Sequence, residues 1–266
     1  MIAIGRKFTE EQFIHVVVPT LRIDESFIAT IRSLSRLEDL LGRIIVVAPA
    51  AVCEEADVFT DLGVEFFPEK GKGVYCCFNQ AIAELGQSDG YVLFLGAGDC
   101  VVAVSDCLRA AMLSRSDVIM TGIIRPDGPN GMAGKPEHLF RTKGCFLARL
   151  PHHQGMLYRM ELIRNTLYPE NFGIYGDVVQ RARALKAPSC VSIDLTMVET
   201  AEAGVSNYKD WRRIWKHLAE RAKLSMPLIL MGEPLLAVRY FAGSFKVMNS
   251  AIRRTFHWKN VEGGKS

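Results

Sequence analysis

The sequence lacks the cysteine and histidine patterns of a zinc-binding or disulfide-stabilised protein. Its seven cysteines are scattered, no Cys-x-x-Cys pair occurs, and the adjacent Cys76 and Cys77 cannot form an ordinary disulfide with each other. The six histidines show none of the spacings typical of zinc ligands. These absences argue against a metal-stabilised or disulfide-rich fold, and they favour a reduced, cytoplasmic setting.

Targeting signals and long apolar runs are also lacking. Met1–Glu11 carries Arg6 and Lys7, but neither an apolar segment nor a small-residue cleavage site follows, so no secretory signal is expected. Prolines and charged residues interrupt the apolar stretch from Met226 to Trp258, which therefore falls short of the about 20 apolar residues of a spanning helix. No internal repeat or low-complexity tract occurs. With 49% hydrophobic residues, the chain is expected to fold around one sizeable core.

Charge is distributed unevenly along the chain. The formal net charge is +3, but residues 208–260 hold eleven Lys/Arg and three Asp/Glu, so this stretch is +8 and the remainder is −5. Such a basic segment suggests an anionic partner, and a membrane surface fits an apolar tail with interspersed Arg and Lys. A solvated helix face, or a helix docked on the main domain, explains the same pattern.

Strand and helix patterns alternate through the first hundred residues. β-branched and aromatic runs predict strands, and offsets of 0, 3, 4, 7, 8 and 11 from Val74 predict a helix ending near Leu85. Asp24 is a candidate N-cap for a helix with Phe27 and Ile31 on its apolar face. The predicted strands are 13–19, 43–48, 63–67, 91–95, 117–124 and 190–197; the predicted helices include 54–61, 74–85, one after Tyr175, and 208–224.

Repeated βα units predict an α/β fold: a mostly parallel sheet with helices on both faces. Ligands of such sheets bind beyond the carboxyl ends of the strands, which directs attention to the loops after Pro19, Ala48, Phe67 and Leu95. Residues 125–150 are richer in Gly, Pro and polar residues, and we expect loops and short antiparallel strands there.

The fourth predicted strand runs into Gly96-Ala97-Gly98-Asp99. Small residues allow a ligand to approach the backbone closely, and a carboxylate at this edge suits a cation that bridges phosphates. One acidic residue after a strand is a weak signal on its own, and a surface-turn aspartate explains it equally well.

An ordered set of motifs over about residues 13–207 resembles glycosyltransferase family 2, in particular members that build bacterial surface polysaccharides. The motifs are Val16-Val-Val-Pro-Thr20, Phe67-Pro-Glu-Lys-Gly-Lys-Gly-Val-Tyr75, Asn79, Tyr91-Val-Leu-Phe-Leu-Gly-Ala-Gly-Asp99, His153-Gln154 with Tyr158-Arg159, Tyr175-Gly-Asp177 and Gly204-Val-Ser206. The resemblance implies a three-layer GT-A fold over residues 1–207, followed by a basic, amphipathic helical region at 208–266.

The resemblance further implies an inverting sugar transfer from a nucleotide sugar to a glycan or lipid-linked acceptor, with no role for nucleic acid. Donor-binding positions are then Pro19, Thr20, Glu69, Gly73, Tyr75, Asn79, Gly96, Ala97, Gly98 and Asp99, and Asp99 also binds Mg²⁺ or Mn²⁺. Asp177 is the matching general base, and His153 and Gln154 line the acceptor side. The setting implied is assembly of lipopolysaccharide, capsule or exopolysaccharide by a cytoplasmic protein peripheral to the inner face of the plasma membrane.

The residues themselves leave plainer interpretations open. Asp177 is also suited to a helix first turn, the His152-His153 pair to a loop without a ligand, and Glu69 with Lys70 to an exposed turn.

Four positions depart from the family pattern: Ala48 and Gly71 stand where acids are usual, Cys76 replaces the Asp of a Tyr-Asp pair, and Gly96 replaces an acid or amide. A hydrogen bond to a charged group contributes about 1.5–3 kcal/mol, so losing two weakens donor binding on the order of a hundredfold unless neighbours compensate.

Two other functions therefore compete. The missing acids favour a non-catalytic scaffold of an assembly complex. Val92-Leu-Phe-Leu-Gly-Ala-Gly98 superficially resembles the S-adenosylmethionine loop of methyltransferases, although Phe94 and Cys100 occupy the places of that motif's acid and third glycine.

Overall fold

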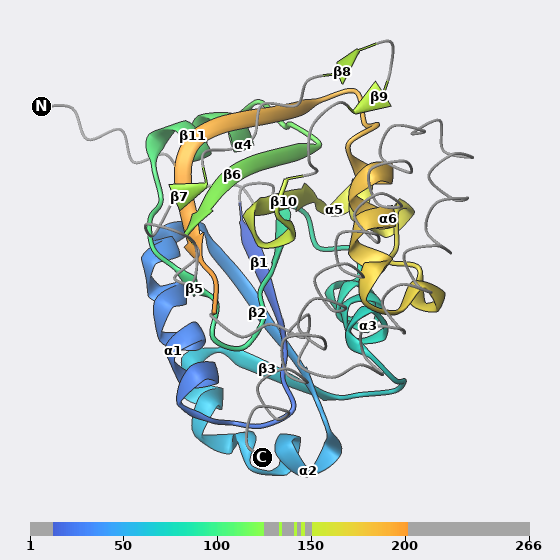
Figure 1. Ribbon diagram of the computed structural model, residues 1–266. Coiled ribbons are helices and arrows are strands. Elements are labelled where there is room, and N and C mark those ends of the chain that lie inside the picture. Colours follow the sequence, from blue (N-terminus) through green and yellow to red (C-terminus); the bar gives the residue numbers. More distant parts are fainter. Residues whose placement is uncertain (1–12, 125–132, 135–140, 143–144, 147–150, 202–266) are drawn as a thin grey trace, which may run out of the picture.

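The computed structural model describes residues 13–124, 133–134, 141–142, 145–146 and 151–201 of the 266-residue chain. Within these residues a nine-stranded sheet forms the centre of the molecule (Figure 1). Its order is β3-β2-β1-β4-β10-β6-β11-β5, with β7 paired to β6, and a separate small hairpin joins β8 to β9. The strands are β1 (Ile14–Pro19), β2 (Leu41–Ala48), β3 (Val64–Pro68), β4 (Tyr91–Phe94), β5 (Cys100–Val101), β6 (Val118–Ile124), β7 (Ala133–Gly134), β8 (Arg141–Thr142), β9 (Cys145–Phe146), β10 (Met156–Arg159) and β11 (Cys190–Glu199).

The first four long strands are parallel, as the alternating sequence predicts. β1 lies between β2 and β4, and β3 pairs with the outer side of β2. β10 then enters antiparallel between β4 and β6, while β11 runs parallel to β6. The carboxyl ends of the four parallel strands β1 to β4 therefore place the loops after Pro19, Ala48, Pro68 and Phe94 at one edge of the sheet, called the carboxyl edge below.

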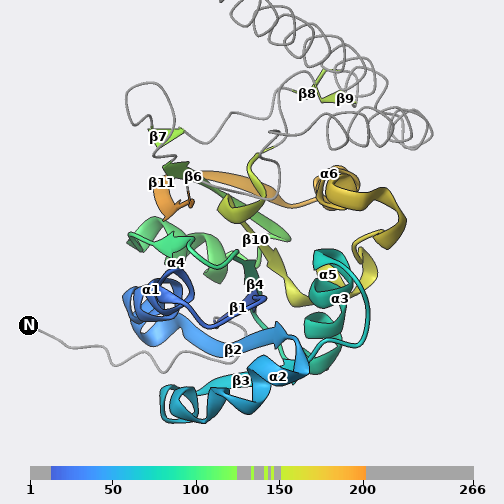
Figure 2. The same ribbon diagram turned by 60° about the horizontal axis from the view of Figure 1, so that its bottom comes forward.

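Helices cover both faces of this sheet. They are α1 (Glu25–Ser33), α2 (Ala50–Glu54), α3 (Val74–Leu85), α4 (Asp106–Leu113), α5 (Met160–Asn165) and α6 (Gly176–Ala184), with 3₁₀ segments η2 (Leu34–Leu40), η3 (Ala56–Leu62), η4 (His153–Gly155) and η5 (Glu170–Tyr175). Figure 2 shows α1 and α4 on one side of β1, and α3 and α5 on the other. None of the helices in these ranges is long and apolar enough to cross a membrane.

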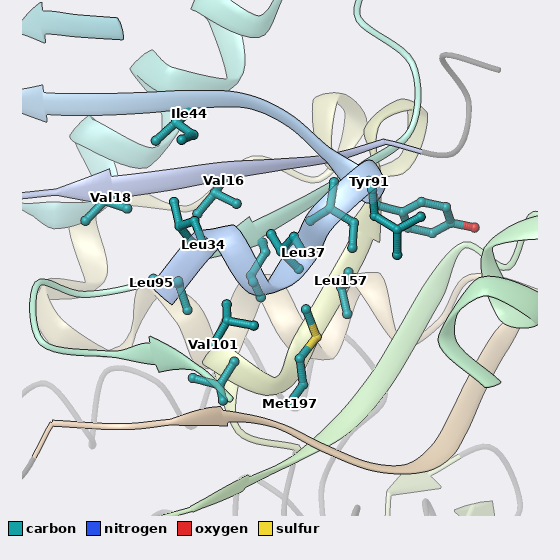
Figure 3. Packing of buried hydrophobic residues seen from close by; sticks show 14 of the residues in the cluster. Val16, Val18, Leu34, Leu37, Ile44, Tyr91, Leu95, Val101, Leu157 and Met197 are labelled. Carbon is teal, nitrogen blue, oxygen red and sulfur yellow. The ribbon is translucent and has the colours of Figure 1, made fainter. Parts of the chain in front are cut away.

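Two apolar cores fill the layers because β1 is buried on both faces. Val16 and Val18 point to the core shared with α1, η2 and α4, whereas Val17 points to the core shared with α3, α5 and α6. Figure 3 shows the first of these cores, where Leu34, Leu95 and Met197 converge from separate elements. The side-chain alternation of a strand produces this division.

The predicted strands are confirmed to within two residues at either end, and the helix at 74–85 and the Asp24 cap are confirmed as predicted. The single helix predicted at 54–61 is wrong. The chain there forms α2, which ends at Glu54, and then η3, because Glu55 leaves helical geometry between them. The predicted helix 208–224, the tail to Trp258 and most of 125–150 lie outside the described residues.

Candidate active site

The turn after β4 lies at the carboxyl edge and is held by α1 and by the chain beyond β11. Gly98 has φ +101°, a conformation that favours glycine, and its N–H donates to Thr30 Oγ1 on α1 at 2.8 Å. A Cβ at Gly98 would lie 2.9 Å from Ala201 and 3.6 Å from Ser26, so the turn packs between α1 and the end of β11. Glycine at position 98 is therefore required by packing as well as suited to a close ligand.

Asp99 closes this turn from inside. Its Oδ2 accepts the Gly96 N–H at 2.6 Å, its Oδ1 accepts the Ala201 N–H at 3.0 Å, and the Gln154 side chain also hydrogen-bonds it. The side chain is only 4% exposed, and burial raises the pKa of its carboxyl while the three donors oppose that rise. Asp99 thus joins the β4 turn to η4 and to Ala201, two residues beyond β11.

The loop after β1 is shaped by Thr20, which the sequence assigns to donor binding. Its N–H donates to Val47 O at 3.1 Å, and its Oγ1 donates to Arg22 O at 2.7 Å. Thr20 is buried and Pro19 partly buried. Both lie at the carboxyl edge, at the end of the strand that pairs with β4.

The loop between β3 and α3 carries Glu69 and Gly73. The Glu69 N–H donates to Ala48 O at 2.8 Å, its side chain is exposed, and Gly73 takes φ +99° as it enters α3. The buried Gln80 accepts the Lys70 N–H and donates to Pro68 O, which fixes the loop from below. Glu69 is therefore placed at the edge by backbone contacts.

Gly71 in this loop and Cys76 in the first turn of α3, two positions where the resembled family has acids, lie against each other. A Cβ on Gly71 would stand 2.2 Å from Cys76 Sγ, so an acid at 71 fits only if the Cys76 side chain turns away. Ala48 is buried, and its carbonyl is the acceptor for Glu69. The two departures from the family pattern, at positions 71 and 76, are therefore neighbours in space.

Asp177 lies in the first turn of α6 and is bound by two donors. Tyr75 Oη donates to its Oδ1 at 3.1 Å, and an Arg181 terminal nitrogen donates to its Oδ2 at 2.7 Å. Arg181 also donates to the Asp177 carbonyl and to Pro151 O, so it links α6 to the segment that precedes His153. Because Tyr75 is in the first turn of α3, the helix that the loop after β3 leads into, the contact places Asp177 at the carboxyl edge.

Gly176 allows this approach of α6 to α3. A Cβ at that position would meet the Tyr75 ring at 2.6 Å and Pro169 O at 2.8 Å. The Gly-Asp pair of the sequence motif therefore has a steric reason: any side chain at 176 would displace the tyrosine that contacts Asp177.

An aromatic cluster connects the two carboxylates. Tyr75 stacks on Tyr168 with ring centroids 5.6 Å apart, and Tyr168 meets His153 edge-on at 5.6 Å. His153 in turn stacks against Phe94 at 5.6 Å, at the end of β4. Burial lowers the pKa of His153 to about 4, so it is a neutral member of this cluster above that pH. In this conformation its ring packs in the core and does not line an open surface.

Asn79 has a structural task in this arrangement. Its amide nitrogen donates to Tyr168 O at 2.8 Å, its amide oxygen accepts the Tyr168 N–H at 2.9 Å, and it also donates to Glu170. It thereby clamps the chain before η5 onto α3. Donor binding by Asn79, which the sequence predicts, stays a prediction.

The structure brings most of the predicted residues together at one edge. Gln154 contacts Asp99, His153 contacts Phe94 and Tyr168, and Tyr168 leads through Tyr75 to Asp177. Sequence reasoning missed Tyr168, Arg181, Thr30 and Gln80. Only Arg181 carried a signal, since an acid and a base four residues apart share one face of a helix.

The donor set does not fit a divalent-cation site at Asp99. Asp99 is only 4% exposed and both of its carboxylate oxygens accept backbone hydrogen bonds, whereas the side chain of Asp177 is 20% exposed. The described residues also contain no group of three or more His, Cys, Asp or Glu side chains positioned to hold a metal. Mg²⁺ and Mn²⁺ prefer several oxygen ligands, including one or two available carboxylates. A hollow lined by Asp89, Tyr91, Arg115 and Arg159 lies at the opposite edge of the sheet and is not part of this site.

No protein-family model and no curated protein sequence matches this chain. Solved structures do. TarS residues 1–349 from S. aureus, in complex with UDP-GlcNAc, align with TM-score 0.63 and 16% identity over 90% of this chain and 73% of that one. The mannosyltransferase PcManGT from Pyrobaculum calidifontis, with GDP-Man and Mn²⁺, gives TM-score 0.53 and 14% identity over 90% and 75%.

Glucosyl-3-phosphoglycerate synthase from Mycobacterium tuberculosis, with Mg²⁺ and UDP, gives TM-score 0.52 and 15% identity over 84% of this chain and 80% of that one. Likeness at this identity establishes the fold, which is the GT-A fold expected from the sequence motifs: a mostly parallel sheet with helices on both faces.

Proposed function

We propose that this chain is a glycosyltransferase that moves a sugar from a nucleotide sugar to a glycan acceptor with inversion. The observation that carries the proposal is the placement of Asp177 at the carboxyl edge by Tyr75 and Arg181, linked through His153 and Gln154 to the β4 turn. The solved structures with the same fold include two named sugar transferases or synthases with bound nucleotides, which supports a nucleotide sugar as the donor.

In this proposal Asp177 accepts the proton of the acceptor hydroxyl. An ionised carboxylate offers about four acceptor sites, and Tyr75 and Arg181 use two of them, so an acceptor hydroxyl still finds a lone pair. The two donors hold the carboxylate in one rotamer, and the base is thereby oriented before the acceptor arrives. The nucleotide lies across the carboxyl edge, over Thr20 and Glu69 towards the β4 turn.

Substitution of the proposed base tests the activity. We expect Asp177→Asn to reduce transfer from a panel of nucleotide sugars by at least about a hundredfold, because an amide cannot accept the proton. The matched control is Asp194→Asn, an exposed carboxylate on β11, which should leave transfer unchanged. Undiminished turnover in the Asp177 variant would refute the assignment of the base.

The acceptor is proposed to be a membrane-associated glycan of the cell surface, with the protein bound peripherally at the inner face of the plasma membrane. The +8 charge of residues 208–260 supports this proposal. Flotation with vesicles containing anionic lipid at low salt tests it. We expect binding that weakens as salt is raised, whereas protein that remains free at low salt contradicts membrane association.

A further inference from the structure

The bonding of Asp99 differs from that of a carboxylate that awaits a cation. Its two oxygens accept the N–H groups of Gly96 and Ala201, at 2.6 and 3.0 Å, and the Gln154 side chain adds a third bond. Because Asp99 is only 4% exposed, its carboxylate would have to turn to meet a ligand at the surface, and turning it would break the closure of the β4 turn and release Ala201. Losing two charge-assisted hydrogen bonds would weaken any metal binding at Asp99 on the order of a hundredfold or more.

The neighbouring positions offer little compensation. Gly96, beside Asp99, has no side chain to offer a ligand. Ala48, at the end of β2, is buried and apolar. Gly71 and Cys76 contact each other and supply no carboxylate. Among the residues described, the β4 turn therefore presents backbone groups and one inward-facing carboxylate to a ligand, and no set of outward oxygen ligands.

A cation of the chain itself lies in the neighbouring loop of the same carboxyl edge. Arg22 is in the loop after β1, the strand beside β4, and the α1 helix that follows it contacts Gly98 through Ser26 and Thr30. Its side chain is 80% exposed, and its ion pair with Asp24 is on the surface. Exposed ion pairs are weak, so the guanidinium can exchange Asp24 for a phosphate, which it binds with planar, paired donors.

We propose that this chain binds a nucleoside diphosphate without a divalent cation, with Arg22 supplying positive charge where related folds employ a metal. The proposal rests on the proposed function, since it presupposes a nucleotide at the carboxyl edge. It assigns Asp99 to holding the turn together and Arg22 to contacting the diphosphate.

Calorimetric titration of the full chain with UDP, GDP, CDP, ADP and dTDP tests the proposal, in buffer with EDTA and in buffer with Mn²⁺. We expect at least one nucleotide to bind with a Kd that agrees within about twofold between the two buffers. We expect Arg22→Met to raise that Kd about tenfold or more, and Arg32→Met, an exposed arginine in the last turn of α1, to leave it unchanged.

Three outcomes contradict the inference in distinguishable ways. A Kd that decreases tenfold or more with Mn²⁺ shows that a cation takes part, and leaves the proposed function intact. A Kd that is equal in both buffers but insensitive to Arg22→Met removes the role of Arg22. Failure of every nucleotide to bind in either buffer rejects the proposed function, and this inference with it.

Discussion

At the scale of single residues, the contact between Tyr75 and Asp177 joins two segments that are 102 positions apart in the sequence. The phenol has two tasks, because its ring stacks on Tyr168 while its hydroxyl donates to the carboxylate. Burial and the nearby carboxylate raise the pKa of Tyr75, so the hydroxyl keeps its proton and remains a donor.

Removing only that hydroxyl separates the two tasks. We expect Tyr75→Phe to lower the free energy of unfolding by about 1 kcal/mol and to slow transfer about tenfold, since Asp177 loses one of its two donors. Steady-state kinetics with urea unfolding measures both effects.

A matched control is Tyr91→Phe. The Tyr91 hydroxyl is buried and donates to Ser116 O at 2.8 Å near the opposite edge, so a similar stability loss without a change in rate is expected. Equal slowing in the two variants would mean that the Tyr75 effect is general loosening of the fold.

The residue scale is also where sequence reasoning was weakest. Asp177 and His153 could be named from motif order, but the sequence alone does not reveal that His153 is buried against Phe94 or that Asn79 clamps Tyr168. These facts depend on how α3 and the segment before η5 pack, and no local spacing encodes that.

At the scale of elements, the turn after β4 is held by α1 through one hydroxyl. Thr30 is fully buried, and its Oγ1 accepts the Gly98 N–H while donating to Ser26 O. Replacing it with valine keeps the shape and leaves the Gly98 donor without its acceptor.

We expect Thr30→Val to destabilise the chain by about 1–3 kcal/mol, the cost of an unpaired buried donor, and to weaken nucleotide binding because the turn loosens. Urea unfolding and calorimetry measure the two effects. Thr166→Val is the control, since that hydroxyl only donates to Leu162 O within α5 and is partly exposed. If both variants bind nucleotide like the unsubstituted chain, α1 does not support the turn.

Elements with a regular period could be predicted from the sequence, and short ones could not. The run before Pro19 and the helical offsets after Val74 identified β1 and α3, because buried strands and amphipathic helices repeat their apolar residues regularly. β10 was missed because its four residues, Met156–Arg159, are too few to show a period. α4 was not predicted either, although it begins after a recognisable cap, Ser105, whose Oγ accepts the Leu108 N–H.

At the scale of the whole molecule, two buried histidines couple folding to pH. His15 accepts the Arg43 N–H at Nδ1 and so carries its proton on Nε2, which donates to Asp89 O. Burial lowers the pKa of His15, and it lowers the pKa of His153 to about 4. His15 lies near the amino end of β1, whereas His153 lies at the carboxyl edge, against Phe94 at the end of β4.

The sign of the effect follows from proton counting. Below the unfolded pKa of about 6.5, the unfolded chain binds protons that the folded chain excludes, so stability is complete above pH 6.5 and decreases as the pH falls. For His153 the shift to about 4 corresponds to about 3 kcal/mol lost by pH 4, and His15 adds to this in the same direction.

Urea unfolding at pH 7.5, 6.0, 5.0 and 4.5 measures this loss, and variants assign it. His153→Phe keeps an aromatic ring among Phe78, Phe94 and Tyr168, and we expect it to flatten the pH dependence. His15→Gln should remove the smaller part, because glutamine stays neutral. Since the two histidines lie at opposite edges, their effects should add. If His153→Phe retains the full pH dependence, the imidazole titrates in the folded chain as it does in water, and the aromatic cluster between Asp99 and Asp177 is open to solvent.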